Sequence, residues 1–84
     1  MNKSTKSIKV LYFAILKDER GLDSEVIETE VSNAQELYCE IKDKHQLTIA
    51  PERLTVAIND EMSSWQEKLS SNDVVAFLPP VAGG

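Results

Sequence analysis

The strongest structural signal in the chain is the apolar stretch Ile8-Lys9-Val10-Leu11-Tyr12-Phe13-Ala14-Ile15-Leu16, which is matched near the other end by Val74-Val75-Ala76-Phe77-Leu78. Both stretches are rich in β-branched and aromatic residues and are apolar on both alternating sets of positions, a pattern typical of a central strand covered on both faces. We therefore expect them to lie side by side in the middle of a sheet. A long crossover separates them in the chain, so the two strands should be parallel.

The residues that follow the first stretch predict a hairpin and then a helix. Residues 17–21 are charged and end in glycine, which indicates a turn or an exposed loop. Residues 24–31 alternate between apolar and polar side chains, which predicts an antiparallel partner strand. Asn33 and Glu36 have the spacing of a capping box, so a helix should begin here. At about 100° per residue, its apolar stripe comprises Ala34, Leu37, Tyr38, Ile41 and His45.

A third strand and several turns complete the predicted order of elements. Residues 54–58 alternate as a strand and residues 59–61 form a tight turn. Residues 63–69 are expected to form one short helical turn, in which Trp65 and Leu69 close an end of the core. The chain is too short for two layers of helices, so we expect a mixed sheet of roughly four to five strands with one main helix across one face. This α+β arrangement is the ubiquitin-like β-grasp fold.

Composition limits the classes of function that the chain can serve. Its 84 residues make one domain at positions 8–78, preceded by a polar extension at 1–7 and followed by a tail at 79–84. The net charge of −5, without a basic cluster, argues against nucleic acid as a partner and favours a protein with a basic face. No apolar run approaches the ~20 residues of a membrane span, and the start lacks a signal-peptide pattern, so we expect a cytoplasmic protein.

Side chains that could carry chemistry are few. Cys39 is the single cysteine and cannot form an internal disulfide, so we expect a partly exposed, incidental thiol on the helix. His45 has no candidate triad around it and is expected to be structural. Asp60 and Glu61 lack further ligands at suitable spacing, so we interpret them as a solvated turn and expect no metal site. We expect no bound cofactor and no enzymatic activity of the chain on its own.

The sequence ends in Pro79-Pro80-Val81-Ala82-Gly83-Gly84, which we interpret as its functional part. Glycine lacks a Cβ, so Gly83 and Gly84 can pass through a channel too narrow for other residues. The proline pair fixes φ and favours an extended path, so the base of the tail should be stiff. The tail could present its carboxylate for activation by another protein, or it could be a frayed end. The buried strands beneath it favour the first interpretation.

Three segments carry a resemblance to a known family: Ile8-Lys9-Val10-Leu11-Tyr12-Phe13-Ala14, Val56-Ala57-Ile58-Asn59 and, most specifically, a strand that closes on Phe77-Leu78 before Pro-Pro-Val-Ala-Gly-Gly. They resemble the MoaD family, the small sulfur-carrying subunits of molybdopterin synthase. The resemblance covers most of the chain from Ile8 onward. The family's loop after the first strand usually carries an arginine and a Glu-Leu-Gly-like stretch, whereas this chain has Lys17-Asp18-Glu19-Arg20-Gly21.

The resemblance implies a mechanism for the tail. In this family the terminal carboxylate, here that of Gly84, becomes an acyl adenylate with ATP on a separate activating enzyme of the MoeB type, and sulfur then displaces AMP. The resulting thiocarboxylate inserts, with residues 79–83, into the active site of the large subunit, MoaE. There its sulfur passes to cyclic pyranopterin monophosphate to form molybdopterin, in molybdenum cofactor biosynthesis. The catalytic residues are expected on the large subunit.

The resemblance also implies an assembly, in which two carriers sit on a large-subunit dimer as a heterotetramer. Phe13 and Leu78 match family positions that form an apolar docking face around the tail, and the strand pattern is equally consistent with a core role for either residue. Three alternatives for the chain remain open. It could carry sulfur for another pathway such as thiamine biosynthesis, act as a ubiquitin-like modifier that joins Gly84 to lysines, or serve as a plain β-grasp interaction module.

Overall fold

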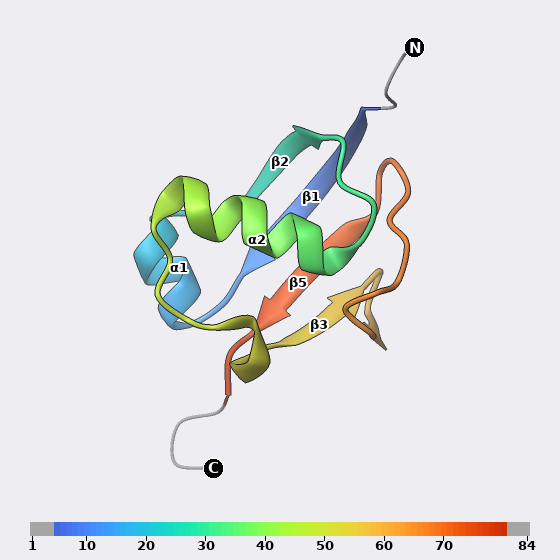
Figure 1. Cartoon of the computed structure of the whole chain (residues 1–84). Coiled ribbons are helices and arrows are strands. Elements are labelled where there is room, and N and C mark those ends of the chain that lie inside the picture. Colours follow the sequence, from blue (N-terminus) through green and yellow to red (C-terminus); the bar gives the residue numbers. More distant parts are fainter. Residues whose placement is uncertain (1–4, 81–84) are drawn as a thin grey trace.

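The computed structural model describes residues 5–80 and shows a five-stranded mixed sheet with one long helix across one face (Figure 1). The elements in chain order are β1 (Lys6–Tyr12), α1 (Ile15–Arg20), β2 (Ser24–Thr29), α2 (Ala34–His45), the short 3-10 helix η1 (Pro51–Arg53), β3 (Thr55–Ile58), β4 (Glu61–Ser63) and β5 (Val74–Leu78). The strand order across the sheet is β2-β1-β5-β3-β4. The predicted α+β class with a mixed sheet is confirmed.

β1 and β5 lie side by side at the centre of the sheet and run parallel, as the sequence predicted. Along this ladder Val10 pairs with Val75, and Tyr12 pairs with Phe77. All four side chains are buried in the core between the sheet and α2. β3 pairs antiparallel with the other edge of β5, so β5 is held by hydrogen bonds on both sides.

α2 begins at the predicted cap and covers the sheet with the predicted stripe. The Asn33 side chain accepts a hydrogen bond from the backbone N–H of Glu36, and the Glu36 side chain accepts one from the N–H of Ser32. His45, at the end of the stripe, is half-buried, and Cys39 is exposed as expected. The remaining members of the stripe are all buried: Ala34, Leu37, Tyr38 and Ile41.

An aromatic cluster closes one end of the core. Tyr38 lies 5.0 Å from Phe77 and 6.0 Å from Trp65 between ring centroids, and Trp65 stacks on Phe77 at 5.8 Å. The Tyr38 hydroxyl donates to the carbonyl of Ile49 at 2.7 Å, and burial raises the pKa of Tyr38 to about 12. The predicted packing of Trp65 and Leu69 against the core is therefore confirmed.

The first predicted strand is too long, and the loop predicted after it is wrong. β1 ends at Tyr12, and the chain then forms helix α1. Ala14 adopts a left-handed φ of 56°, which ends the strand and turns the chain so that Leu16 is buried in the core. Gly21 ends α1 with a φ of 80° and donates its N–H to the Lys17 carbonyl. The charged segment is therefore the exposed side of a helix.

The short helical turn predicted at residues 63–69 is wrong in its position. Residues 61–63 form β4, which pairs antiparallel with β3. Asn59 and Asp60 have φ values of 53° and 71°, the conformation of a two-residue hairpin turn. The short helical turn of the fold lies at η1 instead. Pro51 occupies the first position of η1, where a backbone N–H would have no partner within the helix, so the N–H that proline lacks costs no hydrogen bond.

Within residues 5–80, only one face of the two central strands is covered. α2 packs on the face that carries Val10 and Phe77, whereas Leu11, Ala76 and Leu78 on the other face are half-buried. The expectation that these strands are covered on both faces is therefore wrong. A single long helix can cover only one side of the sheet, so the apolar residues on the second side stay accessible to a partner.

Candidate functional site at the base of the tail

The tail leaves the domain directly from the end of β5, a central strand (Figure 1). Because β1 and β3 hold β5 from both sides, the point where the tail departs is fixed relative to the core. Pro79 is half-buried against the domain, and Pro80 is exposed. The remaining predicted site residues lie outside the described residues: Val81, Ala82, Gly83 and Gly84.

An apolar surface, which we call the open face, adjoins the tail on the side of the sheet away from α2. Phe13 and Leu78 form its end next to the tail, and Phe13 is 44% exposed. An accessible apolar surface on a small domain is typical of an interaction site. The rest of the open face is one row that cross-strand pairing aligns over four strands, in which Met62 is exposed, Leu11 and Ala76 are half-buried and Ala57 is buried.

Phe13 and Leu78, the two residues predicted for the docking face, occupy corresponding positions. Phe13 directly follows Tyr12, and Tyr12 pairs with Phe77, so the backbones of Phe13 and Leu78 lie at adjacent positions of neighbouring strands. Phe13 is exposed and Leu78 is half-buried, and neither side chain belongs to the buried core. The geometry therefore favours a surface role for both residues at the root of the tail.

A polar network fixes the turn that presents Phe13. The Tyr12 hydroxyl donates to Glu25 Oε2 at 2.5 Å, and Arg20 donates to both Glu25 carboxylate oxygens at 2.9 and 2.7 Å. The Arg20 guanidinium lowers the pKa of the Glu25 carboxyl, while burial raises the pKa of the Tyr12 hydroxyl. Sequence reasoning missed this network, which joins α1 to β1 and β2. In the sequence, the network could have been suspected from the opposite charges of Arg20 and Glu25, which lie on either side of Gly21.

Sequence reasoning also missed a groove beside the base of the tail, with a volume of about 570 Å³. The Glu19 carboxylate accepts hydrogen bonds from the backbone N–H and the hydroxyl of Thr48, which ties α1 to the segment that follows α2. Because the walls come from separate parts of the chain, no local pattern could have indicated the groove. The main lining residues are Ile15, Ile49, Ala50, Arg53, Pro79 and Pro80.

The described part of the chain offers a binding surface at the root of the tail. Within residues 5–80, no three histidine, cysteine, aspartate or glutamate side chains are grouped so that they could hold a metal ion. No helix in this part of the chain is long and apolar enough to cross a membrane. What the site provides is a strand held rigidly on both sides, a tail that starts from it, and an apolar surface around the root of that tail.

Comparison with known proteins assigns the chain to a family. The sequence model of the ThiS family matches residues 10–84, which include the whole tail. The chain belongs to the ThiS family. The molybdopterin synthase sulfur carrier subunit of Escherichia coli is 31% identical to this ThiS-family chain over 80 residues, which cover 92% of this chain and 99% of that protein. The predicted resemblance to such carriers is thereby confirmed.

Solved structures confirm the fold of this ThiS-family member. One subunit in the protein–protein complex of subunits 1 and 2 of the molybdopterin-converting factor from Helicobacter pylori is 25% identical, with a TM-score of 0.63, over 93% of this chain and 99% of that one. A ubiquitin from Caldiarchaeum subterraneum has the same TM-score at 11% identity, over 96% of this chain and 100% of that one, which shows the fold alone. The predicted ubiquitin-like β-grasp fold is confirmed.

Proposed function

We propose that this ThiS-family chain is the sulfur carrier subunit of a molybdopterin synthase. The observation that carries the proposal is its 31% identity to such a carrier over 92% of the chain. In this function the chain supplies sulfur for molybdenum cofactor biosynthesis, and the catalytic side chains belong to the large subunit. The exposed thiol of Cys39 fits the reducing cytoplasm in which we place the protein.

The proposed reaction takes place at the carboxylate of Gly84. A carboxylate is a poor electrophile because its leaving group would be oxide, so an activating enzyme first joins it to the α-phosphate of ATP and releases pyrophosphate. A sulfur donor then displaces AMP, which leaves a terminal thiocarboxylate. In the large subunit this sulfur attacks a carbon of cyclic pyranopterin monophosphate, where a C–S bond forms as a C–O bond breaks. Water then cleaves the bond between this sulfur and the acyl carbon of Gly84, which restores the Gly84 carboxylate. The dithiolene of molybdopterin contains two sulfur atoms, so two charged carriers are consumed in turn.

The tail has the length and stiffness that insertion into a partner requires. Residues 79–84 span about 20 Å when extended, at ~3.3 Å per residue. The rings of Pro79 and Pro80 fix φ, so the tail loses less conformational freedom on insertion than an all-glycine tail would lose. Gly83 and Gly84 have no Cβ atoms and suit a narrow channel at the end of this path.

The open face is the proposed docking surface for a large subunit of the MoaE type. Phe13 and Leu78 lie at its end beside the root of the tail, so a partner that covers them also receives the tail. An activating enzyme of the MoeB type must enclose Gly84 as well and approaches from the same side. The two partners therefore compete for one surface, and the carrier leaves the synthase before it is recharged. Two carriers on a large-subunit dimer form the proposed heterotetramer.

Intact mass and reconstitution together test this function. We expect the chain purified from its own cell to carry one sulfur in place of one oxygen, and this species to form molybdopterin with a MoaE-type subunit and the pterin precursor. Sulfur transfer to a thiazole precursor alone would identify a carrier for thiamine biosynthesis, which membership of the ThiS family also allows. Conjugates to lysines of larger proteins would identify a modifier, and a chain that is never modified would exclude both functions.

A further inference from the structure

The outer edge of β2 carries backbone groups that have no partner within the described part of the chain. β2 is the first strand of the sheet, and among residues 5–80 it pairs only with β1. The hydrogen bond from Tyr12 N to the Asp23 carbonyl, at 2.9 Å, sets the pattern of the ladder. Because bonded and non-bonded pairs alternate along an antiparallel ladder, Ser24, Val26 and Glu28 direct their N–H and C=O groups away from β1. Among the described residues, these backbone groups have no hydrogen-bond partner.

This edge is the longer of the two edges of the sheet. β4, at the opposite edge, has three residues, whereas β2 has six. Val26, at the middle of β2, is 65% exposed. An edge strand with free N–H and C=O groups is a template on which a further strand can pair. β2 therefore offers three successive outward positions to an extended segment.

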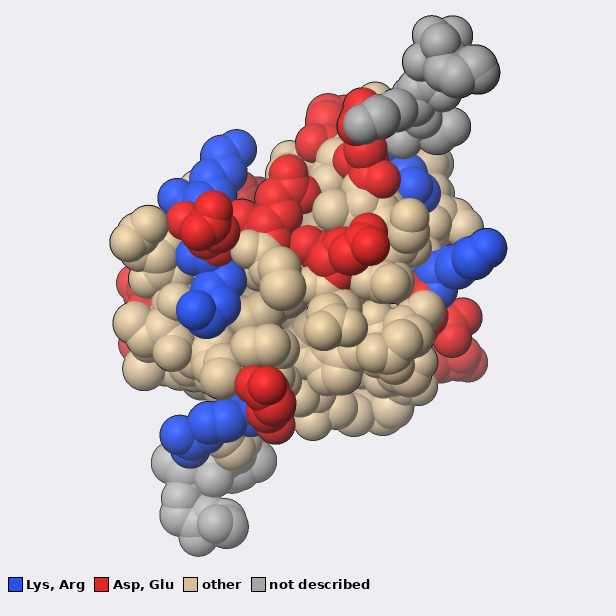
Figure 2. Space-filling view, viewed as in Figure 1, with Lys and Arg blue, Asp and Glu red and all other residues tan. Residues whose placement is uncertain are grey.

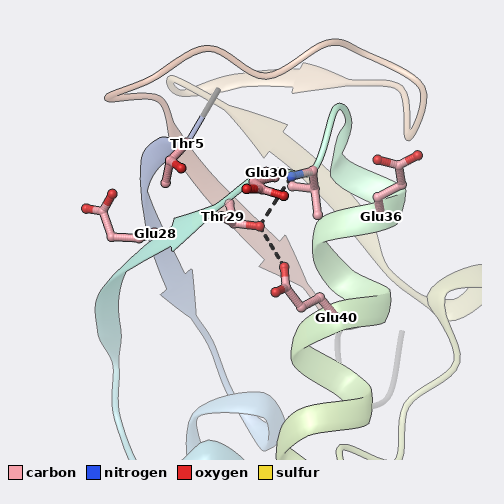
Figure 3. A pocket seen from close by; sticks show the side chains of 7 residues that line it. Thr5, Glu28, Thr29, Glu30, Glu36 and Glu40 are labelled. Carbon is pink, nitrogen blue, oxygen red and sulfur yellow. Dashed lines mark hydrogen bonds between the residues drawn. The ribbon is translucent and has the colours of Figure 1, made fainter. Parts of the chain in front are cut away.

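The surroundings of this edge are strongly acidic. Figure 2 shows Asp and Glu side chains gathered over α2 and the neighbouring end of β2. A hollow of about 580 Å³ lies there, and Figure 3 shows Glu28, Glu36 and Glu40 around it, together with Thr29 at the end of β2. Its walls come from Thr5 just before β1, from β2, from the segment that joins β2 to α2, and from α2.

The donors that these three glutamates use are uncharged. Glu28 accepts from the Ser7 hydroxyl, Glu40 accepts from the Thr29 hydroxyl at 2.7 Å, and Glu36 accepts from the Ser32 backbone N–H at 2.8 Å. The nearby Lys6 ammonium donates to the Val31 carbonyl at 2.9 Å. Because these donors are neutral, they do not cancel the negative charge of the three carboxylates. The hollow should therefore attract the lysine or arginine side chains of a partner.

We propose that the outer edge of β2 binds an extended, basic segment of a partner protein as a sixth strand. Main-chain hydrogen bonds to Ser24, Val26 and Glu28 would hold the segment, in the mode known as strand addition. Side chains alternate along a strand, so one set faces α2, where Glu36 and Glu40 receive lysine or arginine. The side chains of the other set lie on the opposite face of the sheet, beside the exposed Val26. β1 separates this edge from β5, so the bound segment leaves the tail and its root free.

A titration followed by NMR tests the proposal on the full chain. The probe is a peptide of alternating lysine and valine, added to the isotope-labelled protein at low salt. We expect amide shifts and slowed hydrogen exchange at Ser24, Val26 and Glu28, shifts at Glu36 and Glu40, and weaker binding as salt is raised. A matched peptide of alternating glutamate and valine should not bind. Absence of binding by the lysine peptide, or shifts confined to the open face, would overturn the proposal.

Two comparisons separate strand addition from simple attraction of charge. The lysine peptide with alternate backbone nitrogens methylated keeps its charge and loses its donors on one edge, so it should bind at least about tenfold more weakly. The double variant Glu36→Gln and Glu40→Gln keeps hydrogen-bond acceptors and should weaken binding about threefold to tenfold. Glu61→Gln on β4 is the control and should bind as the unchanged protein does. Equal binding by the methylated peptide, or by the double variant, would overturn the proposal.

Discussion

Replacing Phe13 by alanine should weaken docking on any partner that receives the tail. Phe13 is 44% exposed, so docking can remove roughly 90 Å² of its surface from water, given the ~200 Å² that a phenylalanine side chain presents. At about 25 cal/mol per Å² this area corresponds to about 2 kcal/mol, or a roughly thirtyfold increase in the dissociation constant. The domain should remain folded because the Phe13 side chain is not part of the buried core.

Calorimetric titration of a MoaE-type subunit with each variant measures this change. Leu22→Ala is the matched control, because Leu22 is a large apolar residue with 40% exposure that lies between α1 and β2, outside the open face. Thermal unfolding of both variants, without the partner, establishes that they are folded. An unchanged dissociation constant for Phe13→Ala, or an equal loss for Leu22→Ala, would refute the assignment of the open face as the docking surface.

Three further predictions concern the core, the polar network and the thiol. Phe77→Ala should lower the free energy of unfolding by about 3–5 kcal/mol, because the ring is fully buried against Tyr38; urea denaturation measures this. Arg20→Met should lower the free energy of unfolding by about 1–2 kcal/mol near neutral pH. The pKa of Glu25 is lowered in the fold, so this difference should shrink as acid protonates Glu25; a difference independent of pH would contradict the pairing. Cys39→Ser should leave sulfur transfer unchanged in the reconstituted assay. A large loss of transfer with normal stability would show that Gly84 is not the group that carries the sulfur.

The parts of the fold that follow from local pattern could be predicted from the sequence. The apolar runs around Val10 and Val75 predicted the central parallel pair, because the inward-facing side chains of both runs belong to the middle of the core. Asn33 and Glu36 located the start of α2, since a cap satisfies backbone N–H groups that the helix leaves free. The accessible position of Cys39 followed from helical periodicity alone.

The parts that depend on tertiary contacts could not be predicted in this way. α1 forms because the backbone turns at Ala14 and the Leu16 side chain is buried in the core. The charged sequence that ends in Gly21 predicts neither of these features. β4 depends on pairing with β3, which outweighs the helical preference of the residues after Glu61. The two-sided apolar pattern of β5 was read as burial, whereas Leu78 remains accessible at the root of the tail.

The sulfur-carrying role of Gly84 is tested most directly by a single-turnover assay with chain loaded as the thiocarboxylate, its identity verified by intact mass. Loaded chain should form molybdopterin with the large subunit and return to its unmodified mass. A chain lacking Gly84 should show the same thermal unfolding, because all the described helices and strands lie before this residue. It should form no product, because the terminal group that carries the sulfur is missing. Product formation by the shortened chain, or by chain without sulfur on its terminus, would contradict this role.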